Sequence, residues 1–353
     1  MFRKISLLVV MVVVLVGVTG CIQIKKQTAT TSNLGGVFVS SDRAETWTHH
    51  SLLMTPGETA GSIGAVDTYF LNVDPSDNNA LYLGTFANGL YYSWNAGAGW
   101  NKVEKLGDGM IRDLVVDSKD KCQMYVAKES KIFKSEDCTR TWKEIWYSDN
   151  AEKIVSALAL DWFDSKIVYA GLSDGSLLKS SDYGRSWTAL KNFGSRIREL
   201  IVDPFDSRIL YVGTMDKGLF RTVDKGESFD SLLEGMKDYR GANVYSGLQV
   251  SPKSKGLLIY ASQYGLLRSL DGGTTWAKIG LTSGAGEKIY ALALDPSNTN
   301  ILYYSTDQAF YKSLDGGSNW SVKRMPSTRI ARDLFIYPTD PKRVYMGVYL
   351  PTE

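Results

Sequence analysis

One short phrase recurs seven times along the chain, and its spacing limits the fold more than any other feature of the sequence. In its cleanest copies, at residues 180–187, 269–276 and 313–320, the phrase reads Ser-x-Asp-x-Gly-x-x-Trp. Its third position is occupied by Asp42, Asn95, Asp137, Asp182, Asp224, Asp271 and Asp315, at intervals of 42 to 53 residues. A fixed period of this length is that of a four-stranded propeller blade.

Each repeat also has the pattern of one antiparallel blade. Residues 289–322 contain the strand-like runs ALAL, ILYYST and AFYKS, separated by turn-rich clusters, and a fourth run begins at Trp320. The repeated phrase then lies in the turn between the third and fourth strands, where Asp accepts backbone N–H bonds and Gly supplies a positive φ. The Trp fills the space between blades. We therefore expect the phrase to be architectural and to bind no metal ion or cofactor.

The two ends of the chain complement each other. Residues 36–40 match a third strand and the segment around Trp47 a fourth, whereas residues 331–349 match a first and a second strand with no third. The sequence therefore predicts an all-β fold, a seven-bladed β-propeller of four-stranded antiparallel blades over residues 35–350. Its N- and C-terminal strands share one blade, so the ring closes without a free sheet edge. A closed ring favours a monomer.

The N-terminus has the pattern of a targeting segment. Arg3 and Lys4 precede an apolar run at residues 5–16, and Val-Thr-Gly follows immediately before Cys21. This resembles a bacterial lipoprotein signal, so we expect a signal peptide over 1–20, lipidation of Cys21 and a flexible tether over 21–34. An ordinary signal anchor is the alternative, although the apolar run is short for a membrane span. The chain is then extracytoplasmic, anchored by lipid to the cell membrane or the outer membrane.

Export affects how the two remaining cysteines are interpreted. In an oxidising compartment Cys122 and Cys138 can form a disulfide. The repeat alignment places Cys122 at the start of one strand and Cys138 in the turn that ends the next, at the same end of an antiparallel pair. We expect a disulfide there, which would close a loop of about 17 residues and stabilise the fold by on the order of 3 kcal/mol. Two unpaired thiols are the alternative.

In these repeats, residues 35–350 resemble the Asp-box (BNR) repeat propellers. That group includes bacterial sialidases, sortilin-type receptors, xyloglucan-cleaving glycoside hydrolases and photosystem II assembly-factor-like proteins. The segment 291–317 is most similar in character to the sortilin and xyloglucanase members. The resemblance implies the propeller fold but no single function, because receptors, enzymes and assembly factors share the repeat.

The starts of the first strands converge on the central channel, at the face opposite the Asp turns. Aligning these strands brings seven residues to one height: Tyr69, Arg112, Ser156, Arg198, Ser246, Tyr290 and Arg332. Three of the arginines precede an acid, in Arg112-Asp113, Arg198-Glu199 and Arg332-Asp333, and more basic residues lie upstream, at Lys153, Arg196, Lys288 and Arg329.

These residues allow two interpretations. In the first, Tyr69, Tyr290 and the arginines form a basic mouth that binds carboxylates, sulfated glycans or an acidic protein loop. In the second, each arginine pairs with an acid of a neighbouring blade and only holds the ring together. The candidate ligand-binding residues are Tyr69, Arg112, Arg196, Arg198, Tyr290, Arg329 and Arg332. A second candidate region is the long stretch 48–65, which contains the apolar residues Leu52, Leu53 and Met54.

Composition limits the choice of function. The 40 basic and 38 acidic residues nearly balance, so nothing favours nucleic acid, and two histidines leave little room for histidine catalysis. The three arginines suit a sialidase, but that family's Arg-Ile-Pro signature is absent, and a glycosidase needs two carboxylates about 5–10 Å apart that spacing does not single out. We therefore expect a scaffold that binds an envelope protein or an anionic glycan. The alternatives are a glycoside hydrolase and a purely structural envelope role.

Overall fold

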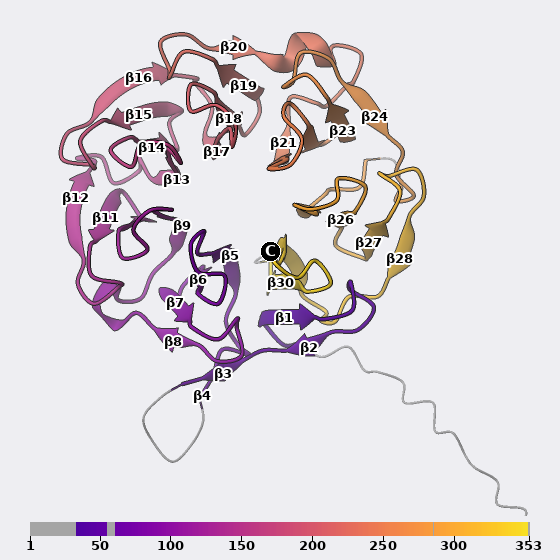
Figure 1. Ribbon diagram of the computed structural model, residues 1–353, viewed down its shortest axis with the longest axis horizontal. Helices are drawn as coiled ribbons and strands as arrows, with labels where there is room; N and C mark the ends of the chain where they lie inside the picture. Colours follow the sequence, from indigo (N-terminus) through magenta and orange to yellow (C-terminus); the bar gives the residue numbers. More distant parts are fainter. Residues whose placement is uncertain (1–32, 55–60, 285, 352–353) are drawn as a thin grey trace, which may run out of the picture. The chain divides into compact units, whose positions relative to one another are not determined.

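The computed structural model describes residues 33–54, 61–284 and 286–351, so the predicted signal peptide, Cys21 and most of the tether lie outside the described residues. The chain divides into two units, Met1–Thr30 and Thr31–Glu353, and the strands of the described residues belong to the second. The described part of this unit forms seven four-stranded antiparallel sheets and one two-stranded sheet. Figure 1 shows the seven sheets arranged as the blades of a ring, which confirms the predicted seven-bladed β-propeller.

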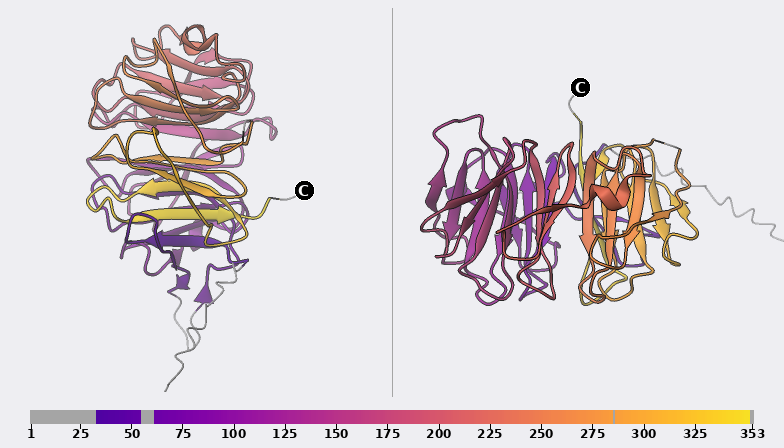
Figure 2. Two further views of the ribbon diagram at one scale, coloured as in Figure 1. Left: turned by 90° about the vertical axis from the view of Figure 1, so that its right-hand side faces the viewer. Right: turned by 90° about the horizontal axis from the view of Figure 1, so that it is seen from above.

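Six blades are each made of four consecutive strands, from the channel outwards. Their bounds are as follows: β5 (Thr68–Val73), β6 (Leu81–Thr85), β7 (Leu90–Ser93) and β8 (Asn101–Lys102); β9 (Ile111–Val116), β10 (Met124–Lys128), β11 (Lys131–Ser135) and β12 (Lys143–Tyr147); β13 (Val155–Leu160), β14 (Val168–Leu172), β15 (Ser176–Ser180) and β16 (Thr188–Asn192); β17 (Ile197–Val202), β18 (Leu210–Thr214), β19 (Gly218–Thr222) and β20 (Asp230–Ser231); β21 (Tyr245–Val250), β22 (Leu258–Ser262), β23 (Gly265–Ser269) and β24 (Ala277–Ile279); β25 (Ala291–Leu294), β26 (Leu302–Ser305), β27 (Phe310–Ser313) and β28 (Ser321–Lys323). Figure 2 shows that the strands run between the two faces of the ring.

The seventh blade joins the two ends of the chain, as predicted. Its strands, in order outwards, are β29 (Ile330–Ile336), β30 (Val344–Tyr349), β1 (Gly36–Ser40) and β2 (Thr48–His49). The register between β1 and β30 pairs Gly36 with Val348 and Ser40 with Val344. Glu45 reinforces this closure, because it accepts hydrogen bonds from Lys312 at 2.7 Å and Lys323 at 2.6 Å on the preceding blade.

The core lies between adjacent blades. The second strand of each blade carries an almost completely buried tyrosine: Tyr82, Tyr125, Tyr169, Tyr211, Tyr260, Tyr303 and Tyr345. Two of these hydroxyls donate to the backbone of a neighbouring blade: Tyr345 to the carbonyl of Ala96 at 2.8 Å and Tyr125 to that of Tyr183 at 3.1 Å. A large ring suits such a position, since its buried area stabilises the contact between blades.

The repeated phrase forms the turn between the third and fourth strands. In the copy at 180–187, Ser180 donates to the Asp182 carboxylate at 2.8 Å, and the same carboxylate accepts the Ser186 amide at 2.9 Å and its hydroxyl at 2.6 Å. Tyr183 and Gly184 both have positive φ, of 64° and 82°, which explains why Gly is preferred at the second of these positions. These bonds support the architectural role expected for the phrase.

The turn lies at the same face as the loop between the first and second strands. The amide at the fourth position of each copy donates to a carbonyl of that loop, as from Tyr183 to Lys166 at 3.0 Å and from Gly316 to Asn300 at 2.7 Å. The starts of the first strands and the loops between second and third strands therefore lie at the opposite face. We call these the Asp-box face and the mouth face.

Two further features concern the predicted loop and cysteines. A disulfide joins Cys122 and Cys138, across the pair of β10 and β11. In the stretch 48–65, β3 (Leu52–Leu53) pairs with β4 (Gly61–Ser62), and Met54 donates its amide to the Trp100 carbonyl at 2.7 Å. The loop thus extends the blade of β5–β8, while residues 55–60 lie outside the described part of the chain.

Candidate functional site

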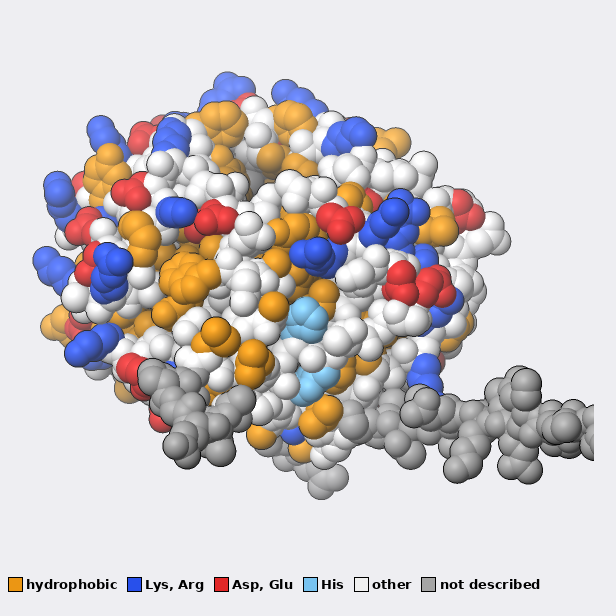
Figure 3. All heavy atoms as spheres, turned by 60° about the horizontal axis from the view of Figure 1, so that its bottom comes forward, with side chains coloured by type: hydrophobic (Ala, Val, Ile, Leu, Met, Phe, Trp, Pro, Cys, Tyr) orange, Lys and Arg blue, Asp and Glu red, His pale blue; other side chains and the backbone are white. Residues whose placement is uncertain are grey.

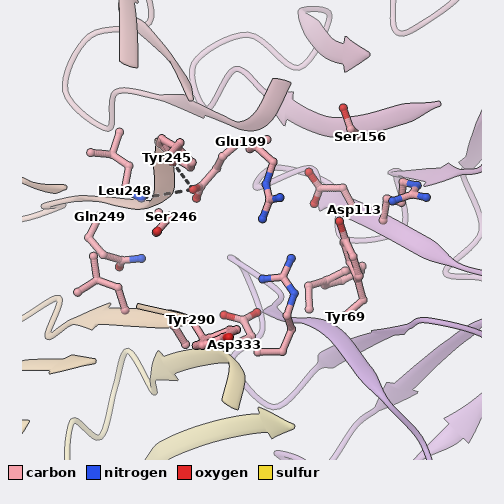
Figure 4. A pocket seen from close by; sticks show the side chains of 17 residues that line it. Tyr69, Asp113, Ser156, Glu199, Tyr245, Ser246, Leu248, Gln249, Tyr290 and Asp333 are labelled. Atoms are coloured by element: carbon pink, nitrogen blue, oxygen red, sulfur yellow. Dashed lines mark hydrogen bonds between the residues drawn. The ribbon is translucent and has the colours of Figure 1, made fainter. Parts of the chain in front are cut away.

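The seven residues that the repeat alignment brings to one height all line a single cavity at the channel. This cavity has a volume of about 180 Å³. Figure 4 shows that the lining residues come from several blades, with the side chains of Tyr69, Glu199 and Asp333 around one space. They come from the first strands β5, β9, β13, β17, β21 and β29 and from Tyr290, which directly precedes β25.

A wider cavity of about 640 Å³ adjoins the first and shares much of its lining, including Tyr69, Arg112 and Tyr290. It extends to residues that precede the first strands and to loops between second and third strands. The latter residues place it at the mouth face: Phe86, Met215 and Gln263. We call the two cavities together the channel mouth.

The lining of the wider cavity is positively charged. It includes five cationic side chains and no Asp or Glu: Arg112, Arg196, Arg198, Lys288 and Arg332. Among the described residues, none of these five forms an ion pair within 4.0 Å of an acid. The Nε atoms of Arg112 and Arg196 are buried and have no hydrogen-bond partner there. On the side of the molecule drawn in Figure 3, basic and acidic side chains are intermixed, in contrast to the lining of the wider cavity.

The acids that follow three of the arginines have partners of a different kind. Asp113 accepts the amide of Leu158 at 2.8 Å, and Asp333 accepts that of Leu71 at 2.7 Å. Glu199 accepts the hydroxyl of Tyr245 and, at 3.4 Å, the amide of Leu248 (Figure 4). Each acceptor thus binds the first strand of the next blade. The acids hold neighbouring blades together through backbone groups, while the arginines face the channel without an acidic partner.

Ser156, at the same height, connects blades in the same way, because its hydroxyl donates to the carbonyl of Ile197 at 2.6 Å. The seven aligned residues therefore include some that join blades and some that line the cavity. Sequence alignment identifies the height of these side chains but not their partners.

The neighbouring arginines lower the pKa of the Tyr69 hydroxyl. Burial by itself would raise the pKa of the Tyr69 hydroxyl, but the positive charges of Arg332, Arg112 and Arg198 outweigh it and bring this pKa below its ordinary value. The guanidinium carbon of Arg332 lies 4.8 Å from the ring centre of Tyr69, and that of Arg112 lies 6.0 Å from it. Lys288 lies 4.6 Å above the ring of Tyr290. Aromatic faces thus support these cations.

The pKa values of the three carboxyl groups in the narrower cavity lie above the ordinary values of Asp and Glu. Burial raises the pKa of Asp113 to about 7, and the nearby charges of Glu199 and Asp333 add to this. Burial also raises the pKa values of Glu199 and Asp333, although each accepts backbone N–H bonds that lower them. Strongly displaced pKa values in a cavity are typical of functional sites, although structural networks produce them as well.

Arg329 lies apart from the channel mouth. Its guanidinium donates to Asp67 at 2.6 Å, and the same Asp67 oxygen accepts the amide of Leu350 at 2.7 Å. Arg329 therefore stabilises the blade that joins the chain ends and does not line either cavity. Lys153, upstream of another first strand, pairs with Asp174 at 2.9 Å.

Several lining residues were not predicted from the sequence. They are the apolar and aromatic side chains of the outer rim of the mouth: Phe86, Met110, Met215, Val244 and Tyr349. Most lie in loops of unequal length, so aligning first strands does not find them. Phe86 stacks on Tyr349, with ring centres 5.3 Å apart, and contacts Tyr69 edge-on at 5.0 Å. The mouth therefore has an aromatic wall beside its cations.

The described residues contain no cluster of three or more His, Cys, Asp or Glu side chains able to hold a metal ion. Nor does any helix among them have the length and apolar character to cross a membrane. The channel mouth, with its cations, tyrosines and carboxyl groups, is the strongest candidate site in this part of the chain.

Comparison with known proteins supports the fold. No family model matches the chain. Residues of this chain are 42% identical over 74 positions to the xyloglucanase Xgh74A of Acetivibrio thermocellus, which covers 20% of this chain and 8% of that enzyme. A Paenibacillus xyloglucanase is 28% identical over 162 residues, or 45% of this chain and 13% of that enzyme.

Solved structures give the same result. The GH74 enzyme of Niastella koreensis matches with a TM-score of 0.66 and 17% identity, over 90% of this chain and 53% of that one. YCF48 bound to D1 peptide matches with a TM-score of 0.60 and 15% identity, over 80% and 93%. The extracellular domain of BT4673 from B. thetaiotaomicron matches with a TM-score of 0.60 and 14% identity, over 82% and 42%.

This chain shares the β-propeller fold of these solved structures. The likeness agrees with the resemblance to Asp-box repeat propellers. At these identities it shows the fold alone. The chain also spans only about half of the GH74 enzyme structure and a smaller share of the curated xyloglucanases.

Proposed function

We propose that this protein binds an anionic glycan in the channel mouth. The observation that carries the proposal is the wider cavity, which five cations line without any acid and without an ion-pair partner in the described residues. Unpaired guanidinium groups in a recessed site favour carboxylate or sulfate groups, which they bind through charge-assisted, often bidentate hydrogen bonds.

The shape and lining favour a saccharide over a protein surface. A cavity of about 640 Å³ is within the range of sites for small ligands, about 300–1,000 Å³, and it is concave. The rings of Tyr69, Phe86, Tyr290 and Tyr349 offer apolar surface beside the cations. An acidic peptide is the competing ligand, since the propeller YCF48 has been solved with a peptide bound.

We further propose that the propeller is extracytoplasmic and attached through a lipid on Cys21. The N-terminal pattern supports this, and one protein with the same fold is an extracellular domain. Incorporation of a labelled fatty acid into the chain, lost in Cys21→Ser, tests the anchor. Equal labelling of both proteins would contradict it.

A binding experiment tests the main proposal. The full chain, purified in a neutral detergent, is titrated with a heparin-derived sulfated hexasaccharide, an oligogalacturonate of the same length and a neutral xyloglucan oligosaccharide. We expect at least one anionic probe to bind and the neutral one not to bind. A triple variant, Arg112→Ala with Arg198→Ala and Arg332→Ala, should weaken binding at least about a hundredfold, because each charged hydrogen bond contributes about 1.5–3 kcal/mol.

The matched control removes the same charge from the Asp-box turns, with Arg140→Ala, Arg185→Ala and Lys225→Ala. It should retain binding within about twofold, because exposed charges far from the ligand act weakly. Equal weakening by both triple variants would mean that only net charge matters and would overturn the site. Tighter binding of a hexaglutamate peptide than of either anionic saccharide would overturn the glycan.

Glycoside hydrolysis is the second candidate function. It is favoured by three carboxyl groups with raised pKa values in the narrower cavity, and by short sequence matches to enzymes named as xyloglucanases. Against it, each carboxyl group accepts hydrogen bonds from the backbone of the next blade. Release of reducing ends from xyloglucan, abolished by Glu199→Gln or Asp113→Asn, would support the enzyme, whereas we expect no release above the buffer blank.

A further inference from the structure

The channel mouth combines two kinds of charged group that do not pair with each other. We infer that binding of an anion there is coupled to proton uptake by Asp113, Glu199 and Asp333, so that the protein holds a strong-acid anion more tightly at pH 6 than at pH 8. The inference rests on the proposed anion binding and adds its regulation by pH.

The geometry places both kinds of group around one space. The cavity of about 180 Å³ is lined by Arg112, Arg198 and Arg332 and, directly after each along the strand, by Asp113, Glu199 and Asp333. In the described residues no ion pair within 4.0 Å connects the two sets. The acids instead accept backbone amides of the next blade. The carboxyl groups are thus near the cations without being neutralised by direct contact.

Asp113 has few ionisable neighbours on the elements packed against its strand. Tyr69 lies on β5. The ionisable residue of β6, Tyr82, is influenced by Asp74 and Asp77. On β10, Tyr125 donates to the carbonyl of Tyr183 at 3.1 Å and Lys128 to that of Leu106 at 2.7 Å. The strand β13, with the sequence VSALAL, has no ionisable side chain.

Across the channel the neighbours of Asp113 are the other two Arg-acid pairs. Glu199 and Asp333 act on Asp113 as nearby negative charges, and Arg332 acts on both of them as a positive one. Within the described residues, the charges of the three carboxyl groups therefore influence one another, and the charge of Arg332 influences Glu199 and Asp333.

The coupling follows from this arrangement. Asp113, whose pKa is about 7, is partly ionised in the empty site near neutral pH. An anion bound to the arginines offsets their positive charge, which had favoured the ionised form of Glu199 and Asp333, and it adds a negative charge near Asp113. Both changes favour the protonated carboxyl. Protons are therefore taken up on binding, and by linkage affinity falls as pH rises, up to about tenfold per pH unit for one proton.

The experiment uses a probe whose own charge does not change. Sulfate esters stay ionised throughout pH 6–8, so the heparin-derived hexasaccharide reports only titration of the protein. Calorimetric titrations of the full chain at pH 7, in buffers with different ionisation enthalpies, give the number of protons exchanged. We expect net uptake of about 0.3–0.5 proton and an affinity about five- to tenfold weaker at pH 8 than at pH 6, because Asp113 is already about half protonated at pH 7 in the unliganded site.

Isosteric variants assign the protons. Asp113→Asn should reduce the uptake by more than half and flatten the pH dependence of affinity, while the hexasaccharide still binds at pH 8. Asp108→Asn, which removes an exposed carboxyl group paired with Lys102 outside the channel, should leave the uptake unchanged. If Asp113→Asn does not unfold cooperatively, Glu199→Gln and Asp333→Asn make the same test, and the buffer series on the unaltered chain needs no variant.

The outcomes separate the two proposals. Absence of binding for every anionic probe at pH 6 and pH 8 would overturn the proposed function, and the inference with it. Binding with no proton uptake and with equal affinity at both pH values would overturn only the inference. Uptake that persists unchanged in Asp113→Asn, Glu199→Gln and Asp333→Asn would overturn the assignment to these carboxyl groups.

Discussion

The carboxyl groups of the Asp-box turns and those of the channel mouth behave in opposite ways. Asp182, in an exposed turn, accepts bonds from Ser186 and Ser180, which lower its pKa to about 2. Asp113, in the channel, accepts two backbone amides, and burial raises its pKa to about 7. A surface carboxylate that accepts several hydrogen bonds stays ionised and stabilises the conformation of its turn. A desolvated one remains able to respond to a ligand.

The arginines show the same division. Arg329 is bonded to Asp67, and its side chain is only 10% exposed, whereas Arg112 and Arg332 have no acidic partner among the described residues. One set completes the ring and the other lines its channel. Four measurements test this comparison, in order of decreasing effect.

The largest expected effect is on stability as a function of pH. The folded pKa of Asp113, about 7, lies above its unfolded value of about 3.9, so its stabilising contribution is complete at low pH and is lost as pH rises through 7. Since one pKa unit corresponds to about 1.4 kcal/mol, this loss is on the order of 4 kcal/mol between pH 4 and pH 8.

The box carboxylates have the opposite sign. Asp182 has a folded pKa below its unfolded value, so its contribution is present above about pH 4 and is lost as pH falls towards 2. Urea unfolding at integral pH values should therefore show greatest stability near pH 4–5. Stability that is constant or rises between pH 5 and pH 8 would contradict the role given to the channel acids.

The second effect concerns one box turn. Asp271 accepts the Ser269 hydroxyl at 2.8 Å and the Thr274 and Thr275 amides at 2.9 Å each. Asp271→Ala should lower the free energy of unfolding by about 2 kcal/mol, as expected for loss of a capping carboxylate. The control Glu227→Ala, at an exposed position of a neighbouring turn, should change it by less than about 0.5 kcal/mol. Equal effects in urea unfolding would contradict a special role for the repeated Asp.

The third test compares two arginines three residues apart. Arg329→Met breaks a largely buried pair with Asp67 and should cost about 2 kcal/mol, less than a fully buried pair because Asp67 is partly exposed. Arg332→Met should cost at most about 0.5 kcal/mol, because it breaks no ion pair. Binding of the sulfated hexasaccharide should show the reverse order. A stability loss for Arg332→Met as large as that for Arg329→Met would indicate that the channel arginines also hold the ring together.

The smallest effect compares two copies of the turn. The fifth position of the phrase is Gly184 in one copy, with φ of 82°, and Thr139 in a degraded copy, with φ of 71°. Gly184→Ala should cost about 1–2 kcal/mol, since an added Cβ would lie 2.5 Å from Ile145 and positive φ disfavours Ala. Thr139→Gly should gain about 0.5 kcal/mol by relieving the same strain. A destabilised Thr139→Gly in thermal unfolding would show that packing of the threonine outweighs its backbone.

Much of the fold and part of the site could be predicted. The seven copies of the phrase predicted seven blades, and the unmatched strands at both ends predicted the shared blade of β29, β30, β1 and β2. The alignment also brought the seven channel residues to one height, because each lies at the equivalent position near the start of the first strand of its repeat. Local periodicity determines these features, so they are visible in sequence.

The partners of these residues could not be predicted. The contact between Asp113 and Leu158 depends on how far one blade is shifted and rotated against the next, and the pairing of Arg329 with Asp67 depends on how the chain ends meet. The aromatic wall of Phe86 and Tyr349 arises from a loop and a strand end that are far apart in the chain. No short-range pattern encodes such distances.

The sequence by itself determined the repeat, the blade count, the box turns and the height of Tyr69, Arg112 and Arg332 in the channel, because these follow from strand periodicity and turn chemistry. Only the tertiary structure decided which charged groups are neutralised. Closure of the ring brought backbone amides to Asp113, Glu199 and Asp333 and left the arginines without acidic partners among the described residues. Charge compensation depends on distances of a few ångströms across the channel, which only the assembled blades define.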